Sequence, residues 1–321
     1  MAQPEAVIQT RGLRRVFKSR SRQVEAVAGV DLIVNRGEIF GFLGPNGAGK
    51  TTTLRMLATL LPPSGGTARV AGCELAAEPG RIRERIGYVG QAGGSDREIT
   101  GRAELVFQGR LYGMSVAAAQ KRAAELIEML ELEGAADRKT GTYSGGQKRR
   151  LDIGLGLVHD PELLFLDEPT TGLDPQSRAR VWEEVMKMHD RGTTVFLTTH
   201  YLDEADALSD RVAIIDYGKI VAEGTPAELK RAIAGDVVTF SVAGEQQRAL
   251  DLVKDQPFVR EARLESGSVH LYVDRGEVAM PALLRLLDGA GLQLMTVELH
   301  RPSLDDVFLR QTGRSLRETA A

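Results

Sequence analysis

Residues 44–51 of the chain read Gly44-Pro45-Asn46-Gly47-Ala48-Gly49-Lys50-Thr51, which satisfies the pattern G-x-x-x-x-G-K-[ST] at every fixed position. An apolar run over residues 38–43 predicts a buried strand before the motif, and residues 52–61 predict a helix after it. In this context the glycines let backbone N–H groups converge on phosphate oxygens at a helix N-terminus. A glycine-rich turn with a chance Lys-Thr pair is the alternative, but such a turn does not need this strand and this helix.

The residues at the end of the motif suit a nucleotide that carries Mg²⁺. Lys50 is expected to neutralise the β and γ phosphates, and the Thr51 hydroxyl is expected to ligate the metal. Thr52 lies in the same predicted helix N-terminus and is expected to complete the phosphate cradle.

Two adjacent carboxylates follow a second apolar run, which predicts a buried strand over residues 163–166. Asp167 and Glu168 then stand at the C-terminal end of this strand, where open α/β sheets bind ligands. Asp167 is expected to hold Mg²⁺ through water, and Glu168 to deprotonate the attacking water as general base. A pair of capping carboxylates before Pro169 is the alternative. Together the two motifs predict an α/β P-loop NTPase, a class that includes kinases, GTPases and many motors.

The composition limits the partners and compartments that fit this chain of 321 residues, of which 42% are hydrophobic. A formal charge of −3 gives no field that would attract nucleic acid, so we expect no nucleic-acid partner. Cys73 is the only cysteine, which excludes an internal disulfide and suits a reducing compartment. Residues 1–6 lack the start of a secretory signal, and no apolar run approaches the about 18 residues of a membrane span. Any membrane role is therefore expected to come through a partner.

The periodicity of apolar residues divides the chain into a large and a small domain. Residues 194–198 predict another buried strand, and helical spacing from Thr100 to about Glu133 predicts a helical subdomain at about 92–160. The large domain is expected to cover residues 1–235. From residue 236 to 321 the pattern predicts a small α+β domain with the ferredoxin-like order β-α-β-β-α-β. Its expected strands are 237–242, 259–264, 269–273 and 292–299, and its expected helices are 246–254 and 278–287.

The small domain holds none of the phosphate-handling motifs, so we expect it to be an accessory or dimerisation domain. Leu304, Val307 and Phe308 fall at helical spacing near its end. They predict an apolar helix face that packs either in the domain's own core or against a second copy of the chain.

A third motif, Tyr143-Ser144-Gly145-Gly146-Gln147, precedes a helical run over residues 148–158. Small residues at a helix N-terminus form a second phosphate nest, with the Ser144 hydroxyl and the Gly146 amide aimed at an anion. By itself the motif could be an ordinary helix start. In this order, between the phosphate loop and the carboxylate pair, it resembles the signature of the ABC ATPases.

The resemblance to ABC ATPases covers about residues 5–230 and implies that each nest faces the phosphate loop of the opposite chain. Two chains would then enclose two ATP molecules as a homodimer. The resemblance also implies that Gln91 contacts Mg²⁺ or water, that Asp174 lies at the dimer seam and that His200 contacts the γ-phosphate and the attacking water. Phe17 would stack on adenine. As lone residues, His200 could instead be a structural hydrogen-bonding group and Phe17 a core residue.

A narrower resemblance rests on residues 89–91, 100–105 and 301–309 and on the tyrosine at the head of the signature. These segments look like the daunorubicin-resistance type of bacterial export ATPase. The resemblance implies ATP hydrolysis that powers efflux of a drug-like or lipid-like substrate through separate polytopic membrane subunits, at the cytoplasmic face of the membrane. Tyr143, Gly90 and Phe17 depart from the residues commonest in ABC proteins, which are Leu, Pro and Tyr, without removing a chemical function. An importer ATPase, or a soluble ABC ATPase with a non-membrane partner, remains the alternative.

Overall fold

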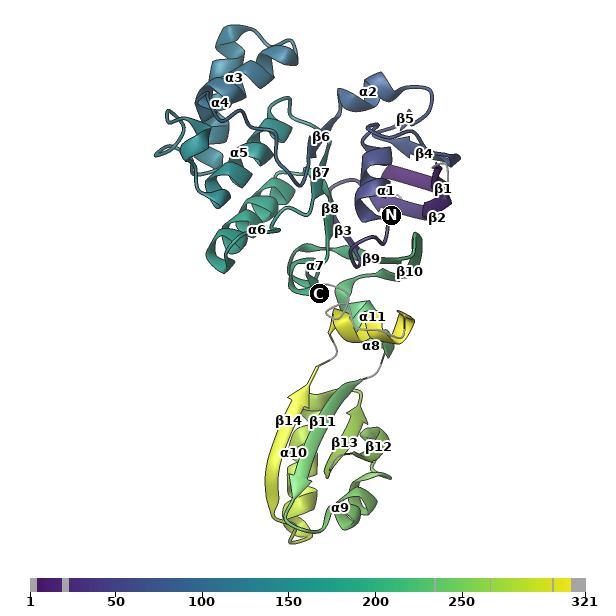
Figure 1. The fold of residues 1–321 in the computed structure, drawn as a ribbon. Coiled ribbons are helices and arrows are strands. Elements are labelled where there is room, and N and C mark those ends of the chain that lie inside the picture. Colours follow the sequence, from purple (N-terminus) through teal and green to yellow (C-terminus); the bar gives the residue numbers. More distant parts are fainter. Residues whose placement is uncertain (1–4, 19–22, 234, 266, 302, 313–321) are drawn as a thin grey trace. The chain divides into compact units, whose positions relative to one another are not determined.

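A computed structural model describes residues 5–18, 23–233, 235–265, 267–301 and 303–312 (Figure 1). The chain divides into two compact units, one ending at Thr225 and the other beginning at Pro226. This division comes earlier than the boundary expected after residue 235. The reason is that helix α8 (Pro226–Ile233) packs against α11 (Leu304–Thr312), so α8 belongs to the C-terminal unit.

The N-terminal unit is built around a six-stranded sheet in the order β10-β9-β3-β8-β7-β6. Neighbouring strands from β9 to β6 are parallel, and only β10 pairs antiparallel at the edge. Every residue of β3, β7 and β8 is buried, which explains why these strands are continuous apolar runs in the sequence. The strands are β3 (Ile39–Leu43), β6 (Ile86–Val89), β7 (Leu163–Asp167), β8 (Thr194–Thr199), β9 (Arg211–Asp216) and β10 (Lys219–Gly224). The three buried strands predicted in this unit are thereby confirmed.

A second, antiparallel sheet of order β2-β1-β4-β5 encloses one hydrophobic core together with α1. Its strands are β1 (Ala6–Lys18), β2 (Gln23–Asn35), β4 (Gly65–Val70) and β5 (Cys73–Glu74), and α2 (Pro79–Arg83) follows. Helix α1 (Lys50–Leu57) is shorter than the helix expected over 52–61. It ends early because Thr59 adopts a left-handed backbone conformation, with φ of 63°, which a continuous α-helix does not allow.

Helices follow β6 in the predicted helical interval at 92–160. They are α3 (Gly101–Leu111), α4 (Val116–Met129), the 3-10 turn η1 (Thr140–Thr142) and α5 (Gly145–Leu157). Thr100, Ser115 and Ser144 cap the three α-helices by accepting hydrogen bonds from backbone N–H groups of the first turn. Helices α6 (Pro175–Asp190) and α7 (Leu202–Leu208) follow β7 and β8. None of the helices within the described ranges is both long enough and apolar enough to cross a bilayer.

The C-terminal unit has the ferredoxin-like order predicted from the sequence. Its elements are β11 (Asp236–Val242), α9 (Gln246–Val253), β12 (Val259–Glu265), β13 (Ser268–Val273), α10 (Gly276–Gly289) and β14 (Leu294–His300). The sheet order is β12-β13-β11-β14 and all pairs are antiparallel. Alternate residues of β11, namely Val238, Phe240 and Val242, are buried in this unit's own core. The predicted apolar face of Leu304, Val307 and Phe308 is buried on α11, which packs on α8 of the same unit.

The cores of the two units share no residue, so we predict that the units unfold in separate transitions. Phe240→Ala should destabilise only the C-terminal transition, by about 3–5 kcal/mol, because Phe240 is fully buried. Urea unfolding followed by circular dichroism measures this. The control Met295→Ala removes an exposed side chain of the same sheet and should change the free energy by less than about 0.5 kcal/mol. A single transition that Phe240→Ala shifts as a whole would contradict the prediction.

Candidate nucleotide-binding site

Four neighbouring strands each deliver one part of the site at the same edge of the sheet. The phosphate loop follows β3, His200 follows β8, Glu168 follows β7 and Gln91 comes shortly after β6. Because the strands are parallel, their C-terminal ends meet at one edge, where an α/β sheet binds its ligand.

The loop of residues 44–49 leads directly into the N-terminus of α1. Gly47 and Gly49 have φ of 80° and 107°, a region that side-chain-bearing residues rarely adopt. A Cβ atom at Gly49 would also lie 2.3 Å from the Ala26 carbonyl oxygen, so only glycine fits there. The loop therefore leads directly into a helix N-terminus, which is the backbone arrangement that a phosphate site requires.

Lys50 is buried and folds back over the loop. Its ammonium group donates hydrogen bonds to the carbonyl oxygens of Gly44 at 2.7 Å and Pro45 at 3.1 Å. It also lies 3.3 Å from Glu168 Oε1, in a pair whose two side chains are 4% and 8% exposed. Burial lowers the pKa of Lys50, against the opposing effect of the Glu168 and Asp167 carboxylates.

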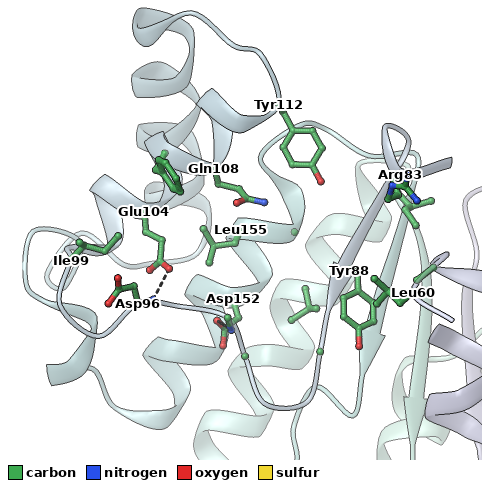
Figure 2. Close-up of a pocket in the computed structure, with 18 residues that line it drawn as sticks. Leu60, Arg83, Tyr88, Asp96, Ile99, Glu104, Gln108, Tyr112, Asp152 and Leu155 are labelled. Carbon is green, nitrogen blue, oxygen red and sulfur yellow. Dashed lines mark hydrogen bonds between the residues drawn. The ribbon is translucent and has the colours of Figure 1, made fainter. Parts of the chain in front are cut away.

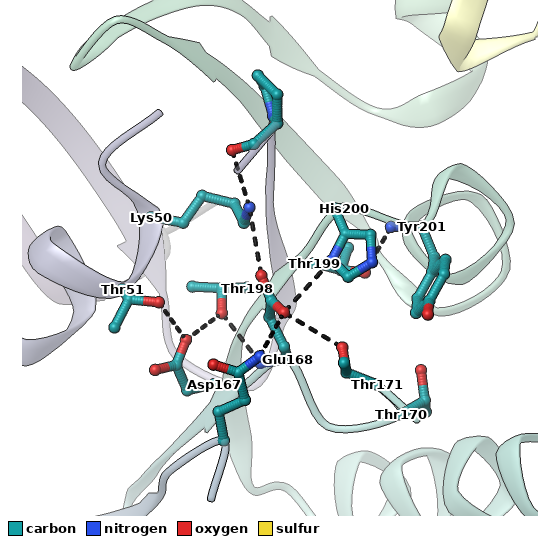
Figure 3. A network of polar contacts seen from close by, with 12 residues as sticks. Lys50, Thr51, Asp167, Glu168, Thr170, Thr171, Thr198, Thr199, His200 and Tyr201 are labelled. Atoms are coloured by element: carbon teal, nitrogen blue, oxygen red, sulfur yellow. Dashed lines mark hydrogen bonds and ion pairs between the residues drawn. The ribbon is translucent and has the colours of Figure 1, made fainter. Parts of the chain in front are cut away.

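Glu168 lies at the centre of the polar network in Figure 3. Its Oε2 accepts hydrogen bonds from Gln91 Nε2 at 3.1 Å and from Thr171 Oγ1 at 3.2 Å, and lies 3.3 Å from His200 Nδ1. Burial on its own raises the pKa of Glu168, but His200 and Lys50 outweigh it and lower the pKa to about 2. Glu168 is therefore an ionised carboxylate surrounded by donors.

The backbone of Glu168 is strained, because its φ of 46° is left-handed and the residue is not glycine. Its N–H group donates to both the carbonyl oxygen and the hydroxyl of Thr198, each at 3.1 Å. These contacts hold the turn after β7 in the conformation that directs the carboxylate into the network.

Asp167 offers one unpartnered oxygen beside Thr51. Its Oδ1 accepts hydrogen bonds from the hydroxyls of Thr51 at 2.9 Å and Thr198 at 2.7 Å. Its Oδ2 is buried and has no hydrogen-bond partner among the residues that the structure describes. A carboxylate oxygen free to coordinate, next to a threonine hydroxyl, is the donor set that Mg²⁺ prefers. The residues present therefore fit the predicted metal.

A cavity of about 600 Å³ opens between these groups. It brings together most of the predicted residues of the phosphate loop and of the strand ends, without Gly44, Pro45, Ala48 and Asp167. It adds Ala26 and Thr171, which the sequence did not single out. The sequence also did not single out Thr198, whose only signal was a hydroxyl within a buried strand. The lining residues are Ala26, Asn46, Gly47, Gly49, Lys50, Thr51, Thr52, Gln91, Glu168, Thr171 and His200.

The predicted signature residues, Asp174 and Phe17 do not line this cavity either. Ser144 caps α5 and is exposed; its hydroxyl accepts from the Gln147 N–H, and the Gln147 side chain accepts from the Ser144 N–H. Asp174 caps α6 by accepting from the N–H and the hydroxyl of Ser177. Phe17 is 41% exposed on β1, with the Arg15 guanidinium 4.7 Å from its ring centroid. Their expected roles toward a second chain and toward adenine stay predictions.

The family comparisons match both units of the chain. The model for ABC transporters matches residues 27–171, and the model for the C-terminal domain of DrrA1-3-like ATP-binding proteins matches residues 224–312. The daunorubicin/doxorubicin resistance ATP-binding protein DrrA of Streptomyces peucetius is 46% identical, over 99% of this chain and 97% of that protein. The Nod factor export ATP-binding protein I of Burkholderia lata is 40% identical, over 98% of this chain and all of that protein.

Among solved structures, the N-terminal unit resembles a dimeric ATP-binding cassette in a post-hydrolysis state bound to ADP and Pi. That cassette has a TM-score of 0.63 and 26% identity, over 68% of this chain and 98% of its own. The sequence is similar to these relatives over nearly the full length, and the phosphate loop and the carboxylate pair have the geometry of a nucleotide site. Together these findings assign the family. The chain belongs to the ABC transporter family, in which it is an ATP-binding subunit that hydrolyses ATP.

Proposed function

We propose that this subunit hydrolyses Mg²⁺-ATP between two copies of the chain and so powers export of a drug-like or lipid-like compound through separate membrane subunits. One observation supports hydrolysis. The ionised Glu168 carboxylate is held beside the phosphate loop by Lys50, Gln91 and His200. The export direction draws on the printed names of the relatives, one for drug resistance and one for Nod factor export. Neither name describes an importer or a soluble ATPase, which are the two alternatives. The site of action is then the cytoplasmic face of the cell membrane.

Binding of ATP would rearrange the partners of Lys50. In the structure its ammonium group is shared between two loop carbonyls and Glu168, and all three are weaker partners than a triphosphate. When Lys50 turns to the β and γ phosphates, Glu168 loses a positive neighbour while its burial, which raises the pKa, remains. The carboxylate thereby becomes a stronger base when the substrate is in place.

The groups around Glu168 then have separate tasks. Glu168 takes the proton of the attacking water, while Gln91 and His200, both on its Oε2 side, orient the carboxylate and the water. Thr51, Asp167 and Gln91 would hold the Mg²⁺, which supplies charge neutralisation on the phosphates.

The signature at the start of α5 supports the two-chain arrangement. Ser144 and Gly145 are exposed, and neither lines the cavity of their own chain. The Ser144 hydroxyl oxygen already accepts a hydrogen bond from the Gln147 N–H, so its O–H group is left to donate to an anion. A phosphate of a nucleotide held by the second copy fits this requirement.

A groove of about 590 Å³ beside Gln91 is our candidate docking face for the membrane subunit (Figure 2). It lies between α3 and α5 on one side and β6 on the other, and Gly90 lines it. Phe107 and Leu60, which are 59% and 54% exposed, both line this groove, and apolar side chains gathered at one depression form a candidate contact surface. An apolar helix of the membrane subunit that seats here would press on the segment that carries Gln91, and hence on Glu168.

The first prediction from this mechanism concerns the base. Glu168→Gln should lower kcat by about 10²- to 10⁴-fold while ATP still binds, since only proton abstraction is lost. Lys50→Ala should abolish hydrolysis through lost phosphate neutralisation and weaken ATP binding as well. Phosphate release and equilibrium binding of a fluorescent ATP analogue measure the two effects. Near-normal turnover of Glu168→Gln would rule out Glu168 as the base.

The composite site can be tested by mixing two damaged chains. In a mixed dimer of Ser144→Arg and Lys50→Ala, both lesions fall on one site and the other site keeps its native Lys50 and Ser144. We therefore expect each mixed dimer to bind ATP at one of its two sites, which is about a quarter of all sites in an equimolar mixture with random pairing, whereas dimers of either variant alone are damaged at both. Nucleotide held by Ser144 and Lys50 of the same chain would overturn the arrangement.

If the membrane subunit binds in this groove, a substitution there should weaken docking without changing ATP hydrolysis. Phe107→Asp should reduce recovery of the subunit with the membrane fraction by about tenfold or more, as expected for a central apolar contact. The ATPase activity of the isolated subunit should be unchanged. Leu111→Asp is the matched control, because Leu111 is 65% exposed on the same helix and does not line the groove. Equal losses in the two variants would contradict the proposed face.

A further inference from the structure

Arg149, in the second turn of α5, reaches the backbone on both sides of the proposed base. It is 7% exposed, and its guanidinium donates hydrogen bonds to three carbonyl oxygens. Nη2 donates to Asp167 at 3.1 Å, Nε to Pro169 at 2.7 Å and Nη1 to Gly90 at 2.7 Å. The first two carbonyls flank Glu168, and the third precedes Gln91. One rigid planar group therefore contacts the main chain beside both the base and the amide that holds it.

This position matters because the conformation of Glu168 is not one that the backbone adopts unaided. Its left-handed φ of 46° is strained and must be imposed by its surroundings. Thr198 holds the N–H of Glu168, and Arg149 holds the carbonyls before and after it. A small rotation of these peptide groups would displace the carboxylate from the phosphate loop.

We infer that Arg149 is a positioning residue for ATP hydrolysis, which acts by fixing the peptide groups around Glu168 and before Gln91. The inference rests on the proposed role of Glu168 as general base. It goes beyond that role, because Arg149 itself lines no part of the cavity and does not touch the phosphate loop.

The chain provides a matched control in the next residue. Arg150 is 5% exposed on the same helix, and its Nη1 donates to the carbonyls of Leu130 at 2.7 Å and Glu131 at 3.1 Å. Both acceptors lie at the end of α4, away from the residues assigned to catalysis. Arg149 and Arg150 thus have the same chemistry and similar burial, but only Arg149 is bound to the base-bearing turn.

The test is steady-state ATPase kinetics of full-length Arg149→Lys and Arg150→Lys. A lysine keeps the charge and most of the stem but cannot bridge three carbonyls, so Arg149→Lys should lower kcat by about 10- to 100-fold. Its affinity for ATP, measured by equilibrium binding, should stay near that of the wild type. Arg150→Lys should keep a near-native kcat. An unchanged kcat in Arg149→Lys, or equal losses in both variants, would overturn the inference.

A double-mutant cycle separates positioning from a general loss of structure. If Arg149 acts through the base, Arg149→Lys should cause little further loss in a Glu168→Gln background, and multiplicative losses would overturn the inference. If Glu168→Gln alone keeps its activity, the base assignment fails, independently of the result for Arg149→Lys. Should Arg149→Lys not fold, Arg149→Gln, which keeps a donor without a charge, replaces it. Failure of both to fold, while Arg150→Lys folds, would make Arg149 purely structural and overturn the inference.

Discussion

The buried ion pair between Lys50 and Glu168 joins the start of α1 to the end of β7, and neither charge is sustainable there alone. An unpaired buried charge costs several kcal/mol, so each group needs the other, or a substitute of the same sign, to remain ionised in the pocket. The two loop carbonyls that Lys50 binds, and the donors from Gln91 and Thr171 to Glu168, complete this compensation. The pair is possible only because β8 alone separates β3 from β7 in the sheet.

The parts of the site that could be predicted are those whose residues are adjacent in the sequence. The phosphate-binding function of residues 44–51 can be recognised from the order of residues within one short segment. Continuous apolar runs likewise indicate strands that are buried on both faces. Gln91 and His200 were placed through the family resemblance, and the structure puts both beside Glu168. Thr198 and Arg149 escaped notice because their contacts join segments distant in the sequence, and a threonine or an arginine carries no local sign of such a contact.

Two boundaries also differ from those expected from the sequence. The end of α1 was misjudged, since apolar residues continue beyond Leu57 while the backbone at Thr59 turns left-handed. The domain boundary differed because α8 packs on α11, a contact between the two ends of the C-terminal unit that no periodicity reveals. The strands of that unit were recognisable from their alternation, as in β11, where every second residue faces the core. Its role as an accessory or dimerisation domain stays a prediction.

The separation of the hydrophobic cores also has a consequence for biosynthesis. No residue after position 225 contributes to the cores of the nucleotide-binding unit as described, so that unit can acquire its packing while the ribosome is still translating the rest. At about 5–20 residues per second, several seconds pass before the C-terminal sheet is complete. Strand β11 is made first and can pair with β13 once that strand emerges, but its other edge waits for β14, which is among the last segments to emerge. The nascent chain thus carries a packed nucleotide-binding unit ahead of a strand with one unpaired edge, the segment that a chaperone would need to shield.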